Sequence, residues 1–373
     1  MSLLYLPNVD PIPLPAPVWL FKVLHIATLM LHFVAVQLIL GGLTLATVWN
    51  LFGKSGSPMA GASDSVVKKL PTVMTYVINF GVPPLLFSQV LYGQTLYTSS
   101  VVIGFYWILV IFLLIAGYYL LYRAGDRADA GRSWWWMGLV SLVLLAYVAR
   151  IYATNMTLML HPERWLALYV ESGGFGGVMP KVDPTTLPRF LFMTVGALGF
   201  GGIAAALLGQ YFTHTDDVKR FLTRTGSLLG AVFLAVQMLC GYWVYAAQPA
   251  VVKEGFWNSP IGYYGAILWA VFSVAALASI AAGGLIKGSL SRLLVSVAGL
   301  AAVLMTAGAV LARDAIRDLS LLAVGFDVWN RTVVANWSVV GIFLVLFVAA
   351  LVLIAVLLVA VNRSMKEVKN QNA

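Results

Sequence analysis

The sequence predicts an all-α polytopic membrane protein with about nine transmembrane helices. Only 10% of the 373 residues are charged and 61% are hydrophobic, whereas soluble domains carry about 25% charged residues. Apolar runs that are long enough to span a bilayer recur along the chain, at residues 18–51, 72–95, 101–122, 134–159, 189–212, 226–248, 262–286, 292–312 and 335–361. A helical bundle of this size forms one unit, so we expect residues 1–373 to be a single transmembrane domain.

Basic residues between the spans predict how the helices are oriented. Lysine and arginine gather after the first, third, fifth and ninth spans, whereas the loop after the second span has neither. Cytoplasmic segments carry an excess of these residues, so we expect the N-terminus outside and the C-terminus in the cytoplasm. This bias explains the formal net charge of +9, which indicates contact with membrane lipid and not with nucleic acid.

Two of the four histidines lie in the first span. His25 and His32 are separated by almost two helical turns, so they share one helix face and lie roughly 10 Å apart along the axis. An ionisable side chain inside a membrane is a candidate for function. The alternative interpretation is that each imidazole only hydrogen-bonds to a neighbouring helix.

The second span combines a predicted break with a polar stripe. Pro83 and Pro84 lack the backbone donors of a regular helix, and their rings oppose a straight path, so we expect a break there. Polar residues follow the prolines towards the outer surface, namely Ser88, Gln89, Tyr92 and Gln94.

Charged residues are also expected near the outer surface. Arg150 lies in the fourth span, and a buried arginine is costly unless it is paired. We therefore expect a carboxylate or a haem propionate beside Arg150, with snorkelling to the outer headgroups as the alternative. The run from Arg313 to Asp318 is predicted to form a charged turn at an outer helix end. It could contact a periplasmic partner or a propionate, but we favour a self-paired helix cap.

Short motifs in several spans resemble the larger, haem-bearing subunit of cytochrome bd-type quinol oxidases, which has nine helices and an external N-terminus. Met30-Leu31-His32-Phe33, followed by Gly41-Gly42, is similar to the family's first helix, in which the histidine ligates a high-spin haem b. Asn79-Phe80 and Gly93 match the second helix, and Gln89 stands where the family has a glutamate.

The fourth and fifth spans extend this resemblance. Asn155 and Met156 before Pro162 are similar to the end of the family's fourth helix. Phe190-Leu191-Phe192-Met193-Thr194-Val195 is similar to a fifth-helix motif whose histidine ligates low-spin haem b, and Met193 stands at that histidine's position. The family's quinol-binding insertion after the sixth helix and its methionine ligand in the seventh have no counterpart in this sequence.

The resemblance implies one or two b-type haems near the outer half of the membrane and a bound quinone. His32 is the leading ligand candidate. Haem iron takes histidine or methionine, so His25 and Met193, each about one turn from an outer helix end, could form a second pair with Arg150 near the propionates. His161 is a further candidate partner for His25. Taken singly, methionines such as Met193 are more often core residues.

The function that the resemblance implies is electron transfer in a bacterial inner membrane. We expect a subunit of a respiratory complex that relays electrons between quinone and a periplasmic redox partner, such as a c-type cytochrome or another redox subunit. Gln89 cannot ionise as the family's glutamate does, and catalytic residues stay unassigned. The alternatives are a quinol:oxygen oxidoreductase subunit and a cofactor-free membrane anchor of a redox complex. A secondary transporter is disfavoured because the spans lack midplane acids.

Overall fold

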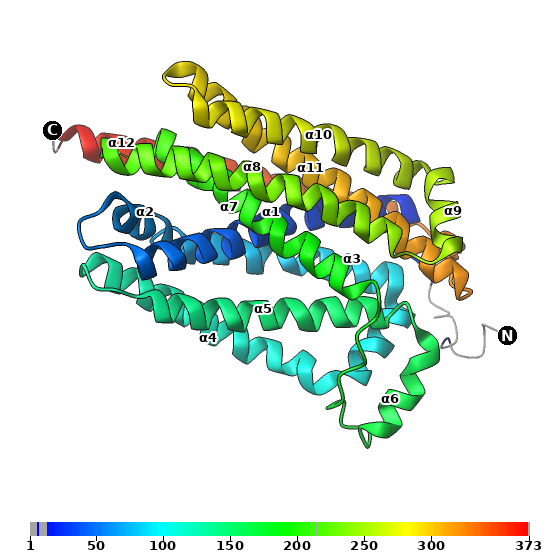
Figure 1. Cartoon of the computed structure of the whole chain (residues 1–373). Helices are drawn as coiled ribbons and strands as arrows, with labels where there is room; N and C mark the ends of the chain where they lie inside the picture. The colour runs from blue at the N-terminus through cyan, green and yellow to red at the C-terminus, as the bar shows by residue number, and fades with distance from the viewer. Residues whose placement is uncertain (1–5, 7–12, 214, 372–373) are drawn as a thin grey trace.

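The protein folds into a bundle of long helices (Figure 1). The computed structural model describes residue 6 and residues 13–213 and 215–371. Eight helices among these residues are long and apolar enough to cross a membrane. The chain is therefore a multi-pass membrane protein by its helix composition, which confirms the predicted all-helical membrane class.

The helix bounds follow the apolar runs, because a spanning segment must satisfy its backbone groups internally. The spans are carried by α1 (Val18–Phe52), α3 (Leu70–Val102), α4 (Gly104–Asp129), α5 (Trp135–Leu158), α7 (Thr186–Tyr211), α8 (Asp216–Ala246), α10 (Pro260–Leu285) and α11 (Ser289–Ala323). Shorter helices lie in the connections, namely α2 (Pro58–Val67), η2 (Pro162–Arg164), α6 (Trp165–Glu171) and α9 (Ala250–Asn258). The predicted ninth span falls in α12 (Trp337–Gln371), whose first part, Trp337–Ala350, is apolar.

Three helices extend well beyond their predicted spans, and one of them, α12, ends at Gln371 and not at residue 361. α11 continues to Ala323, past the predicted end at residue 312, and α8 begins at Asp216 and not at residue 226. The extensions carry charged residues, which a search for apolar runs excludes. Residues 313–318 are consequently part of a helix, and the predicted charged turn is wrong.

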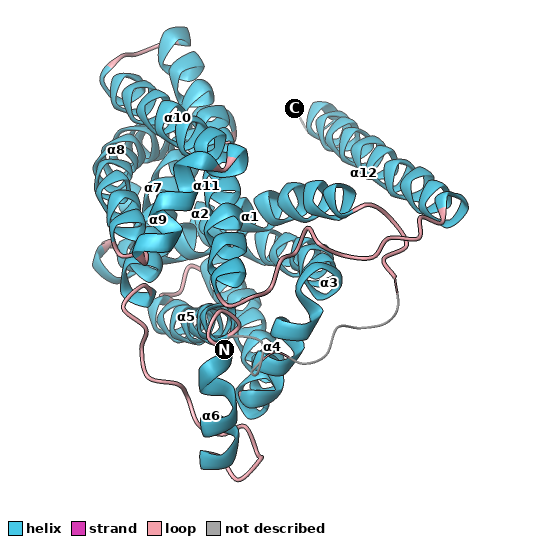
Figure 2. Ribbon diagram, turned by 90° about the vertical axis from the view of Figure 1, so that its right-hand side faces the viewer, coloured by secondary structure: helices cyan, strands magenta, loops and turns pink. Residues whose placement is uncertain are grey.

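The spanning helices form two groups joined by α1 (Figure 1). α3, α4 and α5 lie on one side, α7, α8, α10 and α11 lie on the other, and α1 contacts both α3 and α7. Short helices mark the two ends of the bundle. We call the end with α6 and α9 the α6 end, and the opposite end, with α2, the α2 end. In Figure 2, α12 stands apart from both groups.

Glycines allow α1 and α7 to touch directly. A Cβ atom added at Gly201 would lie 2.6 Å from the carbonyl carbon of Gly41, so no larger residue fits without moving a helix. Small residues at such contacts are typical of membrane helices, which associate through close packing because the surrounding lipid is as apolar as the helices. This contact sets the distance between the two helix groups.

The backbone of α3 stays helical through Pro83 and Pro84, so the break predicted there is wrong. Tyr92 instead has non-helical backbone angles, at φ −125° and ψ 22°. The Pro84 carbonyl accepts a hydrogen bond from the Ser88 hydroxyl at 2.8 Å. The irregular point of α3 therefore falls at a residue whose side chain enters the polar site described below.

The segment before α1 is tied to the segment before α12. The Leu14 N–H donates to the Thr332 carbonyl at 2.9 Å, and the Val334 N–H donates to the Leu14 carbonyl at 3.0 Å. The same segment brings Trp329 over α1, where the Lys22 Nζ lies 5.5 Å from the centroid of its ring. These contacts close the α6 end of the bundle above Lys22.

Replacing Gly201 with leucine should lower the thermal unfolding midpoint of the purified protein in detergent. The added side chain must push α1 away from α7, and overpacking of this kind typically costs about 1–3 kcal/mol. Gly125→Leu is the matched control on α4, because an added Cβ there meets nothing within 4 Å. Equal midpoints for the two variants would contradict the close α1–α7 contact.

Candidate functional site

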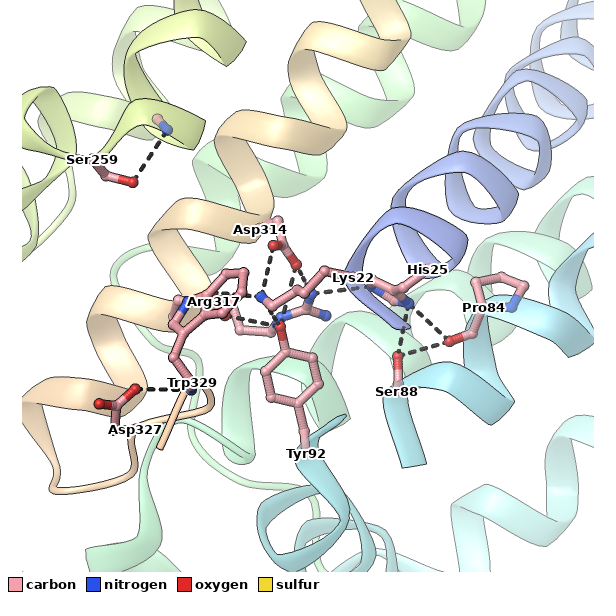
Figure 3. Close-up of polar contacts among 12 residues, drawn as sticks. Lys22, His25, Pro84, Ser88, Tyr92, Ser259, Asp314, Arg317, Asp327 and Trp329 are labelled. Carbon is pink, nitrogen blue, oxygen red and sulfur yellow. Dashed lines mark hydrogen bonds and ion pairs between the residues drawn. The ribbon is translucent and has the colours of Figure 1, made fainter. Parts of the chain in front are cut away.

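A group of charged and polar side chains connects α1, α3 and α11 near the α6 end (Figure 3). We call it the charge cluster, and its members are Lys22, His25, Tyr92, Asp314, Arg317 and Asp318. Lys22, His25 and Asp314 expose only 2%, 1% and 1% of their surface. Buried charges in membrane helices are rare and costly, so the cluster is the first candidate for a functional site.

The Lys22 ammonium group lies at the centre of the charge cluster. Its Nζ donates to Asp314 Oδ2 at 2.8 Å, to Asp318 Oδ2 at 2.5 Å and to the Tyr92 hydroxyl at 2.6 Å. The Tyr92 hydroxyl in turn donates to Asp318 Oδ1 at 2.8 Å. An ammonium group has three N–H donors, so the hydrogen-bonding capacity of Lys22 is fully used.

His25 occupies the α3 side of the charge cluster. Its Nδ1 lies 3.1 Å from the Pro84 carbonyl oxygen, and its Nε2 lies 3.0 Å from Nη2 of Arg317. A guanidinium group can only donate hydrogen bonds, so Nε2 accepts and Nδ1 carries the proton that the carbonyl accepts. The network thus assigns a neutral imidazole that is held at both nitrogens.

Arg317 connects His25 to the acidic side of the charge cluster. Its Nη2 also donates to Asp314, and its Cζ lies 4.0 Å from the centroid of the Tyr92 ring. Cation–π contacts of this kind are worth about 2 kcal/mol or more when they are desolvated. The Arg317 Nε is buried without a hydrogen-bond partner among the described residues.

A small cavity reaches the charge cluster from the α6 end. Its volume is about 120 Å³, and its lining includes Asp318, Asp327 and Trp329. The Asp318 side chain is 14% exposed, compared with 1% for Asp314. Asp318 is therefore the member of the cluster through which water or a small molecule meets the network.

Two further arginines lie beside the charge cluster and form no ion pair with a described residue. Arg313 of α11 is partly buried, and its Cζ lies 5.7 Å from the centroid of the Phe33 ring. Arg189 of α7 is close enough to Arg313 to interact electrostatically, and it donates to Gln248 Oε1 at 3.3 Å. No described carboxylate forms an ion pair with Arg313. A guanidinium group in a membrane favours an anionic partner, so this region suits an anionic ligand.

His32 lies deeper in α1, outside the charge cluster. Its Nδ1 is 3.0 Å from the Val77 carbonyl oxygen of α3, and its ring fits because residue 81 is glycine: an added Cβ at Gly81 would lie 2.9 Å from His32 Cε1. Its Nε2 forms no hydrogen bond with a described residue. Both histidines thus hydrogen-bond to α3, as the simpler interpretation predicts. An Nδ1–H on a carbonyl with a free Nε2 is also typical of metal-ligating histidines.

Three other predicted residues lie outside the charge cluster. Met193 is partly buried in α7, and Gln89 is partly buried in α3. Arg150 is exposed on α5 and has no ion-pair partner among the described residues, so the expectation of a buried arginine is wrong. Val148 and Ile151 occupy the buried face of α5, and the helical repeat then turns Arg150 outward.

His161 belongs to a second polar group, in the connection between α5 and α7. Its Nδ1 lies 2.9 Å from Glu163 Oε1, and its Nε2 lies 3.2 Å from Asp183 Oδ2. Asp183 also accepts hydrogen bonds from the N–H and the hydroxyl of Thr185, at 2.8 Å and 2.7 Å. Both ring nitrogens of His161 face carboxylates, so neither is free for a haem iron in this arrangement.

Sequence reasoning did not assign most of the charge cluster. The sequence does single out Lys22, because it is the one lysine or arginine of the first predicted span. Asp314, Arg317 and Asp318 also follow the spacing that places residues on one helix face. The contact of Lys22 with Asp314 and Asp318 could not be predicted from the sequence, because it depends on how α1 and α11 pack.

Replacing Lys22 with methionine should destabilise the protein by about 3–5 kcal/mol, because loss of one partner leaves buried carboxylates uncompensated. Chemical unfolding in detergent measures the change. Lys68→Met is the matched control: its Nζ pairs with Asp129 at 2.6 Å, but the two side chains are 42% and 69% exposed. Exposed pairs contribute at most about 1 kcal/mol. If the two variants lose similar amounts of unfolding free energy, the charge cluster does not stabilise the protein more than an exposed ion pair does.

The connection between α5 and α7 should depend on pH through Asp183. Burial alone would raise the pKa of Asp183, but hydrogen bonds from Thr185 and the charges of His161 and Arg164 hold that pKa below its usual value. A lowered folded-state pKa stabilises the fold above the unfolded value of about 3.9, and this stabilisation is lost as the pH falls through the folded value.

Asp183→Asn should therefore lower the unfolding midpoint at neutral pH, and the difference from the wild type should shrink below about pH 4. Thermal unfolding from pH 7 to pH 3 measures this difference. A difference that stays constant over the whole range would mean that ionised Asp183 does not stabilise the connection.

A scan against protein-family models and a search of curated proteins both gave no match. The charge cluster, the neighbouring arginines and His32 are therefore the features of the structure that bear on function.

Proposed function

We propose that this protein is a cytochrome bd-like membrane subunit of a respiratory electron-transfer complex in a bacterial inner membrane. It holds b-type haem and relays electrons between membrane quinone and a periplasmic redox partner, such as a c-type cytochrome. The observation that carries this proposal is His32, whose Nδ1 is held by a backbone carbonyl while its Nε2 forms no hydrogen bond with a described residue. The first-span motif Met30-Leu31-His32-Phe33 supports the same residue.

The chemistry of His32 fits a haem, whose iron this side chain would ligate. Haem iron is commonly ligated by histidine, and the Val77 carbonyl would fix the orientation of the ring and raise its basicity. His25 fits less well, because its Nε2 accepts a hydrogen bond from Arg317 and would have to lose it. A haem at His32 is therefore better supported than a His25–Met193 pair.

The arginines beside the charge cluster suit the propionate groups of a haem. Arginine binds carboxylates through charge-assisted hydrogen bonds. Arg313 lies over Phe33, the residue next to His32, and Arg189 lies beside Arg313. In this proposal, Arg313 and Arg189 replace the outward-facing Arg150 as the candidates for propionate contacts.

The other residues of the site would position the ligand and its partners. When bound, haem b supplies one-electron chemistry. The charge cluster holds α1 against α3 and α11, and it thereby keeps His32 and Arg313 at fixed positions. Residues 160–188 and 324–334 lie at the α6 end (Figure 1) and would form the docking surface for the redox partner.

A cofactor-free membrane anchor is the second candidate function. It is favoured by the charge cluster itself, in which the polar atoms of Lys22, His25 and Tyr92 already have protein partners. A quinol:oxygen oxidoreductase has less support, because Gln89 carries an amide that cannot ionise.

A reduced-minus-oxidised spectrum of the purified protein tests the proposal. We expect a haem b α-band in the wild type and its loss in His32→Gly, with recovery on addition of imidazole, which can replace the missing ligand. His161→Gly is the matched control and should keep the band. Absence of the band from the wild type, or its persistence unchanged in His32→Gly, would reject His32 as a haem ligand, and the first result would favour the anchor.

A further inference from the structure

A second cavity lies at the α2 end, far along the bundle from the charge cluster. Its volume is about 120 Å³, and it is enclosed by α1, by α7 and by the residues around the start of α3. Its walls include Leu38, Leu45 and Leu70, and Lys69 is its one charged lining residue. The cavity is therefore an apolar space with a single cation at its edge.

Small residues keep this space open. Gly42 of α1 and Gly201, Ala204 and Ala205 of α7 line it, and none of them has a side chain larger than a methyl group. Gly201 is also the residue at which α7 touches α1, so the helices cannot move closer without a clash of their backbones. The cavity thus follows from the packing of α1 on α7.

Lys69 and its neighbour Lys68 differ in their partners. The Nζ of Lys68 pairs with Asp129 Oδ1 at 2.6 Å, whereas Lys69 forms no ion pair with a described residue. Both side chains are exposed. Basic residues outnumber acidic ones in the connections at this end of the bundle, so the neighbouring protein surface offers Lys69 few carboxylates. An anion from outside the chain would complete its charge balance.

We propose that this cavity binds a segment of one acyl chain of an anionic phospholipid whose phosphate pairs with Lys69. An acyl chain gains little from moving between bilayer and cavity, because lipid tails are as apolar as the cavity wall. The headgroup therefore determines which lipid the site binds more tightly. One lysine near a membrane surface favours an anionic lipid roughly fivefold over a neutral one. The proposal does not depend on haem binding.

Native mass spectrometry of the full-length protein in detergent tests this site, with phosphatidylglycerol and phosphatidylcholine as the two probes. We expect the wild type to retain one phosphatidylglycerol in preference to phosphatidylcholine, by roughly fivefold. Lys69→Gln should abolish the preference, and Lys68→Gln should keep it. Ala204→Leu, which places a larger side chain in the cavity wall, should reduce retention of both lipids.

Equal retention of the two lipids by the wild type would overturn the proposal, as would a preference that survives in Lys69→Gln. Unchanged retention of both lipids by Ala204→Leu would show that the acyl chain does not bind in this cavity. Size-exclusion elution of each variant verifies that it is folded, and Lys69→Gln keeps the test decisive if Ala204→Leu fails to fold. An ordinary lipid-facing surface would retain phosphatidylcholine as well as phosphatidylglycerol.

Discussion

The ion pairs of Lys22 with Asp314 and Asp318 are the interaction on which the rest of the site depends. An ammonium group buried among membrane helices is unfavourable unless carboxylates surround it. Lys22 meets this requirement through α11, and Tyr92 of α3 shares the same carboxylates. One buried cation thus fixes three helices relative to one another.

This network determines which neighbouring groups remain free to bind a ligand. Arg317 uses the lone pair of His25 Nε2 and also pairs with Asp314. His32 and Arg313 lie outside the network: among the described residues, the Nε2 of His32 forms no hydrogen bond and Arg313 forms no ion pair. The different surroundings of the two histidines therefore follow from the charge cluster and not from their spacing in α1.

The contact of α1 with α11 and its contact with α7 are stabilised by different physical means. At the α6 end, hydrogen bonds and ion pairs hold the helices, and the peptide segment around Leu14 covers them. Towards the α2 end, glycines bring α1 and α7 into backbone contact, and dispersion forces stabilise this contact. Close packing of small residues leaves the apolar cavity beside Lys69, whereas the polar network leaves space mainly at Asp318.

The sequence by itself determined the membrane class and the approximate positions of the spans, because length and hydropathy are local properties of a helix. It also singled out His25 and His32 as residues of one helix face. Only the tertiary structure decided that Arg150 points outward, that α3 bends at Tyr92 and not at Pro83, and that Lys22 meets Asp314. The last two residues are 292 positions apart, and no local pattern specifies such a pair, since it depends on the packing and rotation of whole helices.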